Sequence, residues 1–384
     1  MPKPIQLFLM ILLCLCPPLA LADKPKIVWF STLKEDTSEK SGFWKRVHNL
    51  VLSATEDLDV DFQVYYSEEN FIKLKEQVSA VLKDPSLRPD GIIFHNYKQT
   101  GEFILQQAEI AEVKSIIFNS GLQDDKSHLR PRKQYQHWLG EILPNDSFAG
   151  AELLRHLKEE ASSQASSEKR LEVVAMAGNP SSAAYQARRA GLLAELKRSP
   201  NLEFHQFVPA DWSRETAYKQ LSVINKRYPN NYIFWAANDN MALGLLDKAK
   251  EIGLQPNKDF ITGGIDWLPE ALEKVATGDM HVSIGGHFVE GMWAVILLYD
   301  YLKGKDFKER YGTSIKTKML ALTQANIEYF GDINAKFEIQ NLRNMDFQKL
   351  SLSDNIKLIE YPFDIEYMLN RIPLEDANKA PLPK

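Results

Sequence analysis

The stretch NYIFWAANDNMALGLL, Asn231 to Leu246, indicates how this chain folds. Its first part, Tyr232 to Ala237, is a short aromatic and apolar run, which is typical of a strand buried on both faces of a parallel sheet. Polar residues follow at once, and from Ala242 apolar residues recur at helical spacing. The stretch therefore predicts a strand, a polar corner and a helix. In open α/β sheets, ligands bind at such corners, because these are the carboxyl ends of the strands.

Asn238 and Asp239 occupy this corner. An amide side chain offers a donor and an acceptor, whereas a carboxylate offers acceptors only, and together they suit a neutral ligand with many hydroxyl groups. The alternative is a helix cap, which would need only one of the polar residues found here.

The same alternation of strand and helix patterns continues along the chain and predicts an α/β fold of two doubly wound, Rossmann-like lobes. The chain crosses between the lobes near Asn145 and Asp146. After Gly278, the strand His281 to Gly285 and the helix Val289 to Leu302 are expected to return to the first lobe. The other predicted strands are Lys26–Ser31, Val60–Tyr66, Gly91–His95, Ser115–Asn119, His137–Ile142, Leu171–Ala177, Glu203–Pro209 and Phe260–Gly264.

Composition and charge limit the possible functions. The chain has 384 residues, enough for two domains, and its formal net charge of −5 gives no basic footprint for nucleic acid. A positive start at Lys3, an apolar run over residues 7–15 and the small-x-small site at residues 20–22 predict a cleaved signal peptide, hence an exported protein in the periplasm. No other stretch is apolar enough to span a membrane, and both cysteines, Cys14 and Cys16, leave with the signal.

No enzyme motif is present in the sequence. It contains no GxSxG, HExxH or GxxxxGK[ST] pattern, and no GxGxxG follows its first strand. His281 and His287 are six residues apart, which no common metal motif uses. We therefore expect no catalysis, no cofactor and no metal.

Five stretches of the chain resemble the ribose, galactose and autoinducer-2 class of periplasmic sugar-binding proteins. They are SGFWKRV (41–47), PNDSFAGAEL (144–153), QARRAGLL (186–193), AANDNMALGLL (236–246) and GGIDWLPEALEKVATGDM (263–280). The resemblance covers residues 26–330 and implies the type I periplasmic binding protein fold, with three crossing segments and a hinge that closes on a sugar-like ligand. The expected parts are the signal peptide (1–22), an N-terminal lobe (23–145 and 279–324), a C-terminal lobe (146–278 and 325–345) and a C-terminal extension (346–384).

The resemblance also implies where the ligand binds. The candidate ligand-binding residues are Phe43, Trp44, Asn119, Arg188, Asn238, Asp266, Trp267 and His287. Gly285 departs from the family, which usually has a polar residue there; either His287 substitutes for it or the ligand lacks a group at that point.

Several of these residues have a structural alternative. Trp44 could be a core residue of its helix, and Arg188 could belong to a solvated pair with Arg189. Asp266 could cap the next helix, and Trp267 could only cover the end of the sheet.

These observations predict a monomeric solute-binding protein that closes on a sugar-like ligand and presents it to an inner-membrane ABC permease. The alternative is a receptor that signals through a membrane sensor, such as a histidine kinase, a chemoreceptor or a cyclic-dinucleotide enzyme. An exported hydrolase of this fold is a third possibility, and it would have to turn over a sugar.

Overall fold

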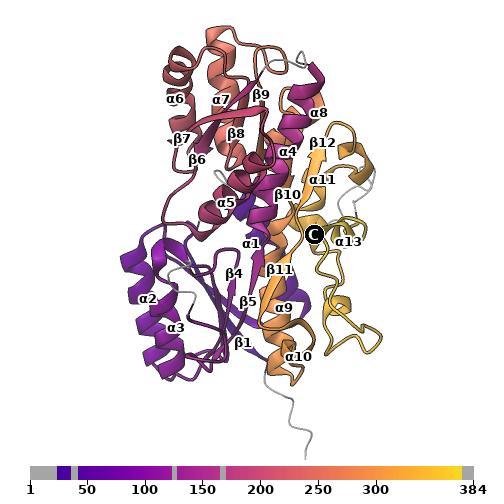
Figure 1. The fold of residues 1–384 in the computed structure, drawn as a ribbon. Helices are drawn as coiled ribbons and strands as arrows, with labels where there is room; N and C mark the ends of the chain where they lie inside the picture. Colours follow the sequence, from indigo (N-terminus) through magenta and orange to yellow (C-terminus); the bar gives the residue numbers. More distant parts are fainter. Residues whose placement is uncertain (1–23, 36–41, 123–127, 165–169, 374–384) are drawn as a thin grey trace, which may run out of the picture.

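The computed structural model describes residues 24–35, 42–122, 128–164 and 170–373. The predicted signal peptide, residues 1–22, lies outside the described residues. Two lobes, each built on a six-stranded sheet, lie one above the other (Figure 1). In the described residues no helix is both long and apolar enough to cross a membrane.

The first lobe contains a fully parallel sheet in the order β11-β5-β4-β3-β1-β2. Its strands are β1 (Lys26–Ser31), β2 (Asp61–Tyr66), β3 (Gly91–Phe94), β4 (Lys114–Phe118), β5 (Trp138–Pro144) and β11 (Ser314–Thr317). Its helices are α1 (Gly42–Asp57), α2 (Phe71–Lys83), α3 (Gly101–Ile110), α9 (Glu290–Leu302) and α10 (Lys308–Tyr311).

Alternate residues of β1 show why this strand is apolar throughout. Val28 and Phe30 belong to the core that includes Leu74 of α2, whereas Trp29 belongs to the core that includes Val47 of α1. Both faces of the sheet are thus covered by helices, as in doubly wound folds.

The second lobe contains the sheet β12-β10-β9-β8-β6-β7, in which only the pairing of β12 with β10 is antiparallel. Its strands are β6 (Leu171–Ala177), β7 (Leu202–Pro209), β8 (Ile233–Ala236), β9 (Ile261–Ile265), β10 (Val282–Gly285) and β12 (Leu320–Thr323). Its helices are α4 (Asp146–Gln164), α5 (Ala183–Lys197), α6 (Arg214–Arg227), α7 (Asp239–Ile252) and α8 (Pro269–Thr277). The predicted strand, polar corner and helix are β8, residues 237–238 and α7.

The chain crosses between the lobes three times in the described residues before residue 324: from β5 to α4, from β10 to α9 and from β11 to β12. One prediction was wrong, because the strand 281–285 pairs with β9 of the second sheet instead of returning to the first. The helix that follows it, α9, does pack on α1 and β4 of the first lobe. An apolar run predicts a strand but does not specify its sheet, so the crossing lies a few residues later than expected.

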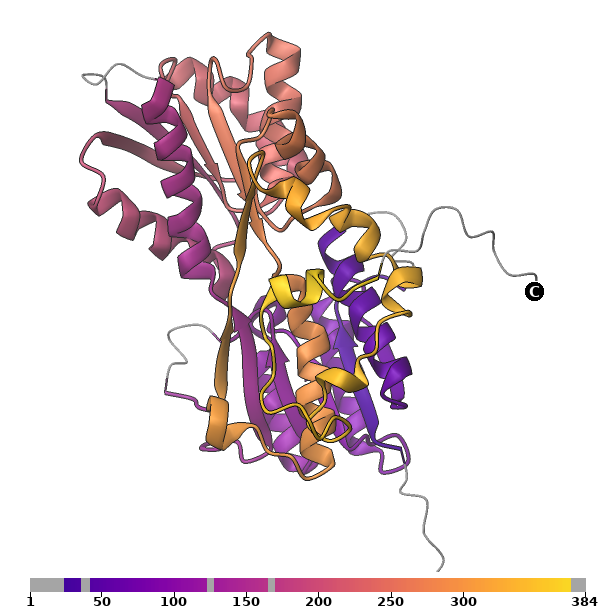
Figure 2. The ribbon, with the colours of Figure 1, turned by 90° about the vertical axis from the view of Figure 1, so that its right-hand side faces the viewer.

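The segment after β12 also differs from the expectation. The short helix Ile327–Phe330 lies against α8 of the second lobe, but α12 (Ile339–Leu342) packs on α1 of the first lobe. Placing residues 325–345 wholly in the second lobe was therefore wrong. Residues 332–373, here called the extension, also include α11 (Ile333–Lys336) and α13 (Ile365–Leu369), and Figure 2 shows them running beside α1 and α9.

Candidate functional site

The candidate residues lie at the corners where the strands of both sheets end and at the starts of the helices that follow. Phe43 and Trp44 begin α1, Asn119 follows β4, and Asn238 is the residue before α7. Arg188 is on α5, Asp266 and Trp267 follow β9, and His287 follows β10.

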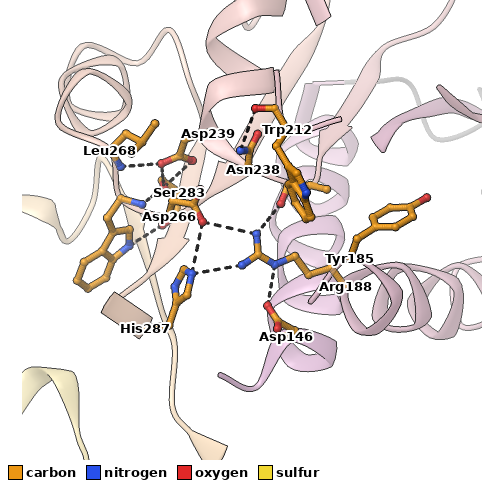
Figure 3. A network of polar contacts seen from close by, with 12 residues as sticks. Asp146, Tyr185, Arg188, Trp212, Asn238, Asp239, Asp266, Leu268, Ser283 and His287 are labelled. Carbon is orange, nitrogen blue, oxygen red and sulfur yellow. Dashed lines mark hydrogen bonds and ion pairs between the residues drawn. The ribbon is translucent and has the colours of Figure 1, made fainter. Parts of the chain in front are cut away.

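Arg188 is the centre of a buried polar cluster (Figure 3). Its Nε donates to Asp146 Oδ1 at 2.7 Å, and its Nη1 donates to the carbonyl of Ala237 at 2.7 Å and lies 3.5 Å from Asp266 Oδ1. Burial alone would lower the pKa of Arg188, but Asp146 and Asp266 outweigh it, and the pKa is raised. The guanidinium is therefore a fixed cation, and the solvated-pair alternative is wrong for this residue.

His287 joins this cluster from the crossing segment after β10. Its Nε2 lies 3.3 Å from Arg188 Nη2 and 3.4 Å from Asp266 Oδ1. The ring of Phe43 lies over the imidazole, with 4.6 Å between centroids. The other ring nitrogen, Nδ1, is buried and has no hydrogen-bond partner among the described residues. A buried polar atom without a partner is costly, so a ligand hydroxyl there would be stabilising.

Trp44 packs against two neighbouring aromatic rings, those of His95 and Phe43. Its indole contacts the ring of His95, with centroids 4.5 Å apart, and is met edge-on by Phe43 at 5.3 Å. Burial lowers the pKa of His95 to about 4, so this imidazole is neutral at pH 7. Trp44 is half-buried, whereas Phe43 is buried. Its indole is therefore partly open to a ligand, although it also packs against the core.

Asn238 has the helix-cap role that was the alternative for this corner, and Asp239 is buried behind it. Asn238 Oδ1 accepts from the N–H of Met241 at 3.0 Å, so it is a helix cap, and its Nδ2 lies 3.4 Å from the Trp212 carbonyl. Asp239 is fully buried and accepts from the N–H of Leu268 at 2.9 Å and from Ser283 Oγ at 2.8 Å. Its burial, and then the nearby Asp266 charge, raise its pKa to about 8. Asp239 therefore holds the next corner in place.

Trp267 lies in the core beneath that corner. The indole is fully buried and its N–H donates to the Ser283 carbonyl at 3.0 Å. A Cβ added at Gly285 would lie 2.5 Å from this indole, so residue 285 has no room for a side chain. Trp267 thus covers the end of the sheet and occupies the space that a polar residue 285 would need.

Asn119 follows β4 and lines a cavity together with residues of the crossing from β5 to α4. Its Nδ2 donates to Glu290 at 3.4 Å; Glu290 is fully buried, which raises its pKa. Asn119 lines a cavity of about 180 Å³ together with Asp146, Ala187 and Lys316. Asp146 also binds Arg188, so Asn119 is near the cluster without bonding to it.

Sequence reasoning missed Asp146, Tyr185 and Trp212. Trp212 follows β7, its ring lies 5.6 Å from the Arg188 guanidinium, and it contacts Tyr185 at 6.2 Å. Its indole lies on Gly178, where an added Cβ would be 2.5 Å away. The rule that residues after strands face the ligand would have found Trp212, since it comes three positions after Pro209, the end of β7.

The described residues contain no group of three or more His, Cys, Asp or Glu side chains that could hold a metal ion. The polar cluster around Arg188 contains a cation, two carboxylates, an imidazole and an aromatic face. Such groups can bind and orient hydroxyl groups on a ring.

Comparisons with known proteins agree with this architecture. Residues 37–306 match the model of the periplasmic binding protein domain. The chain is 23% identical to the galactofuranose-binding protein YtfQ of Escherichia coli over 264 residues, which are 68% of this chain and 77% of the relative. It is 30% identical to the D-allose-binding periplasmic protein of the same organism over 113 residues, or 29% of this chain and 36% of the relative.

A solved structure gives the same result over more of the molecule. The crystal structure of a periplasmic sugar-binding protein from Pseudomonas fluorescens is 28% identical, covers 90% of this chain and 99% of its own, and has a TM-score of 0.78. This match extends over the two lobes and confirms the predicted fold class. The chain belongs to the family of periplasmic binding protein domains, a family of binding proteins and not of enzymes.

Proposed function

We propose that this protein is a periplasmic solute-binding protein that closes on a sugar or similar polyhydroxy ligand and presents it to an ABC importer. One observation carries the proposal: Arg188, Asp266 and His287 meet in one buried cluster beside Phe43. Donors and acceptors at such short spacing match a sugar, in which each hydroxyl group both donates and accepts.

The aromatic residues complete this chemistry. Trp44 and Trp212 are both half-buried, one on each lobe, and an indole face can pack against the apolar face of a sugar ring. Related proteins are named for galactofuranose and allose, and structures of the same fold hold arabinofuranose and myo-inositol. All four are neutral ring compounds with several hydroxyl groups, which supports a ligand of this class.

Energetics require the lobes to close. A hydrogen bond to a charged group contributes about 1.5–3 kcal/mol, whereas association costs about 4–15 kcal/mol, so a few bonds give micromolar affinity only if water is excluded. We propose that the lobes rotate about the three crossing segments, with β1–β5, β11 and α9 moving as one body and β6–β10 with β12 as the other.

A thermal-shift screen tests the binding step. Because a ligand at 100 times its dissociation constant adds about 2.7 kcal/mol, a cognate sugar should raise the melting temperature clearly. The panel should contain furanoses, pyranoses and inositols, with amino acids of similar size as the control. If no polyhydroxy compound stabilises the protein, or if an amino acid does so instead, the proposed ligand class is wrong.

Uptake of the labelled sugar by cells tests the delivery step. Cells that lack this chain should take up the sugar more slowly, and the wild-type chain should restore uptake. Normal uptake combined with loss of a transcriptional or chemotactic response to the sugar would instead support the sensor function.

A further inference from the structure

The extension, residues 332–373, lies wholly outside the region that the family model matches, 37–306. It is attached to the first lobe along α1. Asn49 Nδ2 donates to the Phe337 carbonyl at 3.2 Å, Arg343 pairs with Glu56 at 2.9 Å, and Asp57 accepts from the N–H of Phe347 at 2.7 Å. The extension therefore moves with the first lobe.

Asp300 of α9 fixes the far part of the extension. Its carboxylate is fully buried and accepts from Ser351 Oγ at 2.6 Å, from the N–H of Leu352 at 2.8 Å and from Tyr361 Oη at 2.8 Å. A buried carboxylate with several donors fixes the geometry of the groups around it. The extension is thus a folded part of the lobe.

Arg46 connects the extension to the second lobe. This residue of α1 is buried, and its Nη2 donates to Oδ1 of Asn334 in the extension at 2.5 Å. Its Nη1 donates to the backbone carbonyl of Trp267, at the corner after β9. The guanidinium lies 5.2 Å from the ring centroid of Phe288 and 5.7 Å from that of Phe337, which belongs to the extension.

No carboxylate forms a hydrogen bond or ion pair with Arg46 among the contacts of the described residues. Burial lowers the pKa of Arg46 to about 10, outweighing the opposite effects of the carboxylates of Asp239, Glu338 and Asp332, and the residue stays charged at pH 7. A buried cation held by a carbonyl, an amide oxygen and two rings depends on each of these partners. Without Asn334 and Phe337, Arg46 would lose two of them.

The carbonyl that Arg46 binds belongs to an unusual corner. Asp266 has φ of 134° and Trp267 has φ of 57°, a region that residues with side chains rarely adopt and that surrounding contacts must therefore hold in place. Asp266 is one of the two carboxylates that pair with Arg188 in the ligand cluster. Arg46 therefore fixes the residue next to a ligand-site residue without being part of the cluster around Arg188.

The extension also contacts a crossing segment. A Cβ added at Gly286, between β10 and α9, would lie 2.8 Å from Cγ1 of Ile365 in α13. Gly286 has φ of 97°, which favours glycine. A rotation of the lobes about this segment would have to move it against α13.

We propose that the extension sets the orientation of the two lobes, and that Arg46 and Asn334 are positioning residues for the Asp266 corner. Their effect on ligand affinity rests on the proposed function. Their effect on lobe orientation does not, because it exists without ligand.

Energy transfer between two dyes measures this orientation. The only cysteines of the sequence are Cys14 and Cys16, so protein produced from Asp23 onward can carry two introduced labels and no others. Ile72→Cys on α2 and Val223→Cys on α6 suit the labels, because these residues are 56% and 60% exposed. The two helices lie on the side of the molecule away from β11 and β12, where rotation changes their separation most (Figure 1).

We expect Arg46→Met and Asn334→Ala to change the transfer efficiency of the unliganded protein and to widen its distribution. Arg46→Lys, which keeps the charge but cannot reach two acceptors as a planar fork does, should give an intermediate result. Arg343→Ala is the matched control, because it breaks an exposed ion pair between the extension and α1 far from the corner. It should leave the efficiency unchanged.

Folded Arg46→Met and Asn334→Ala proteins with wild-type transfer efficiency would overturn the proposal. So would a change of equal size in Arg343→Ala, since that would show a general loosening of the extension. Once a ligand is known, Arg46→Met should also weaken its binding about tenfold through faster release. If the variants change the transfer efficiency as expected but the wild-type protein binds no sugar, only the proposed function is contradicted, and the proposal about lobe orientation stands.

Discussion

His287 offers a direct test of the ligand site at the scale of one residue. Because its buried Nδ1 has no partner among the described residues, a ligand hydroxyl there would gain a hydrogen bond at little cost in desolvation. His287→Ala should weaken sugar binding about tenfold in titration calorimetry. His281→Ala is the control, because His281 comes just before β10, at the opposite end of that strand from His287. Equal affinities of the two variants would exclude a ligand contact at His287.

Asn238 combines a structural role with a proposed binding role, and two substitutions separate them. Its Oδ1 caps α7, so Asn238→Ala should lower the free energy of unfolding by about 1 kcal/mol. Asn238→Ser keeps a capping oxygen without adding a charge and loses the amide donors, so it should retain most of the stability while weakening ligand binding. Denaturant titration and calorimetry measure the two effects. Full ligand affinity in the Ser variant would leave Asn238 with the cap role alone.

Asp239 should make the free energy of unfolding depend on pH. Its pKa rises from the ordinary 3.8 to about 8 in the fold, so between these values the folded state binds a proton that the unfolded state has lost. Stability then falls as pH rises through this window. Asp266 and Arg188 face the same carboxylate and contribute opposite effects on its pKa.

Asp239→Asn removes this titration with little change in shape. Relative to the variant, the wild-type protein should lose melting temperature between pH 5 and pH 8, as scanning calorimetry would show. Parallel pH profiles of the two proteins would mean that Asp239 ionises normally in the fold.

Two glycines allow helices α4 and α5 to pack closely together, and this packing fixes the position of Arg188 on α5. Helices α4 and α5 approach so closely that a Cβ at Gly150 would lie 1.9 Å from the Arg188 carbonyl, and one at Gly191 would lie 1.9 Å from the Ser147 carbonyl. Gly191→Ala should therefore lower the free energy of unfolding by about 1–3 kcal/mol and displace α5. Ala194→Ser, on the exposed side of the same helix, should change it by less than about 0.5 kcal/mol. A neutral Gly191→Ala would contradict the close packing.

The sequence predicts where the strands lie better than it predicts which strands they pair with. The apolar runs at residues 26–31 and 171–177 match β1 and β6, because a strand buried on both faces has few polar residues. The run at 281–285 has the same character, yet it belongs to the second sheet. Its sheet is determined by long-range pairing with β9 and β12, which a local pattern does not contain.

The candidate ligand site could likewise be predicted only in part. Polar corners gather at strand ends in this fold, so Asp266 could be placed near the site in advance, whereas Arg188, which lies inside α5, was placed there only by the family resemblance. The cap made by Asn238 and the burial of Trp267 depend on side-chain packing between elements. The link from Arg46 to Asn334 joins residues 288 positions apart and had no signal in the sequence.

The whole molecule places strand tips of two sheets around one region, and this arrangement predicts where a ligand protects the backbone. Sugar binding should slow amide hydrogen exchange most at the corners after the strands, at residues 117–121, 237–240 and 264–268. The starts of β1 and β3, at residues 26–27 and 90–92, should change little, because they lie at the opposite edge of the first sheet from the corner after β4. Exchange measured by mass spectrometry with and without ligand checks this. Protection confined to one lobe, or spread evenly over both ends of the strands, would show that the ligand does not bind between the two sheets.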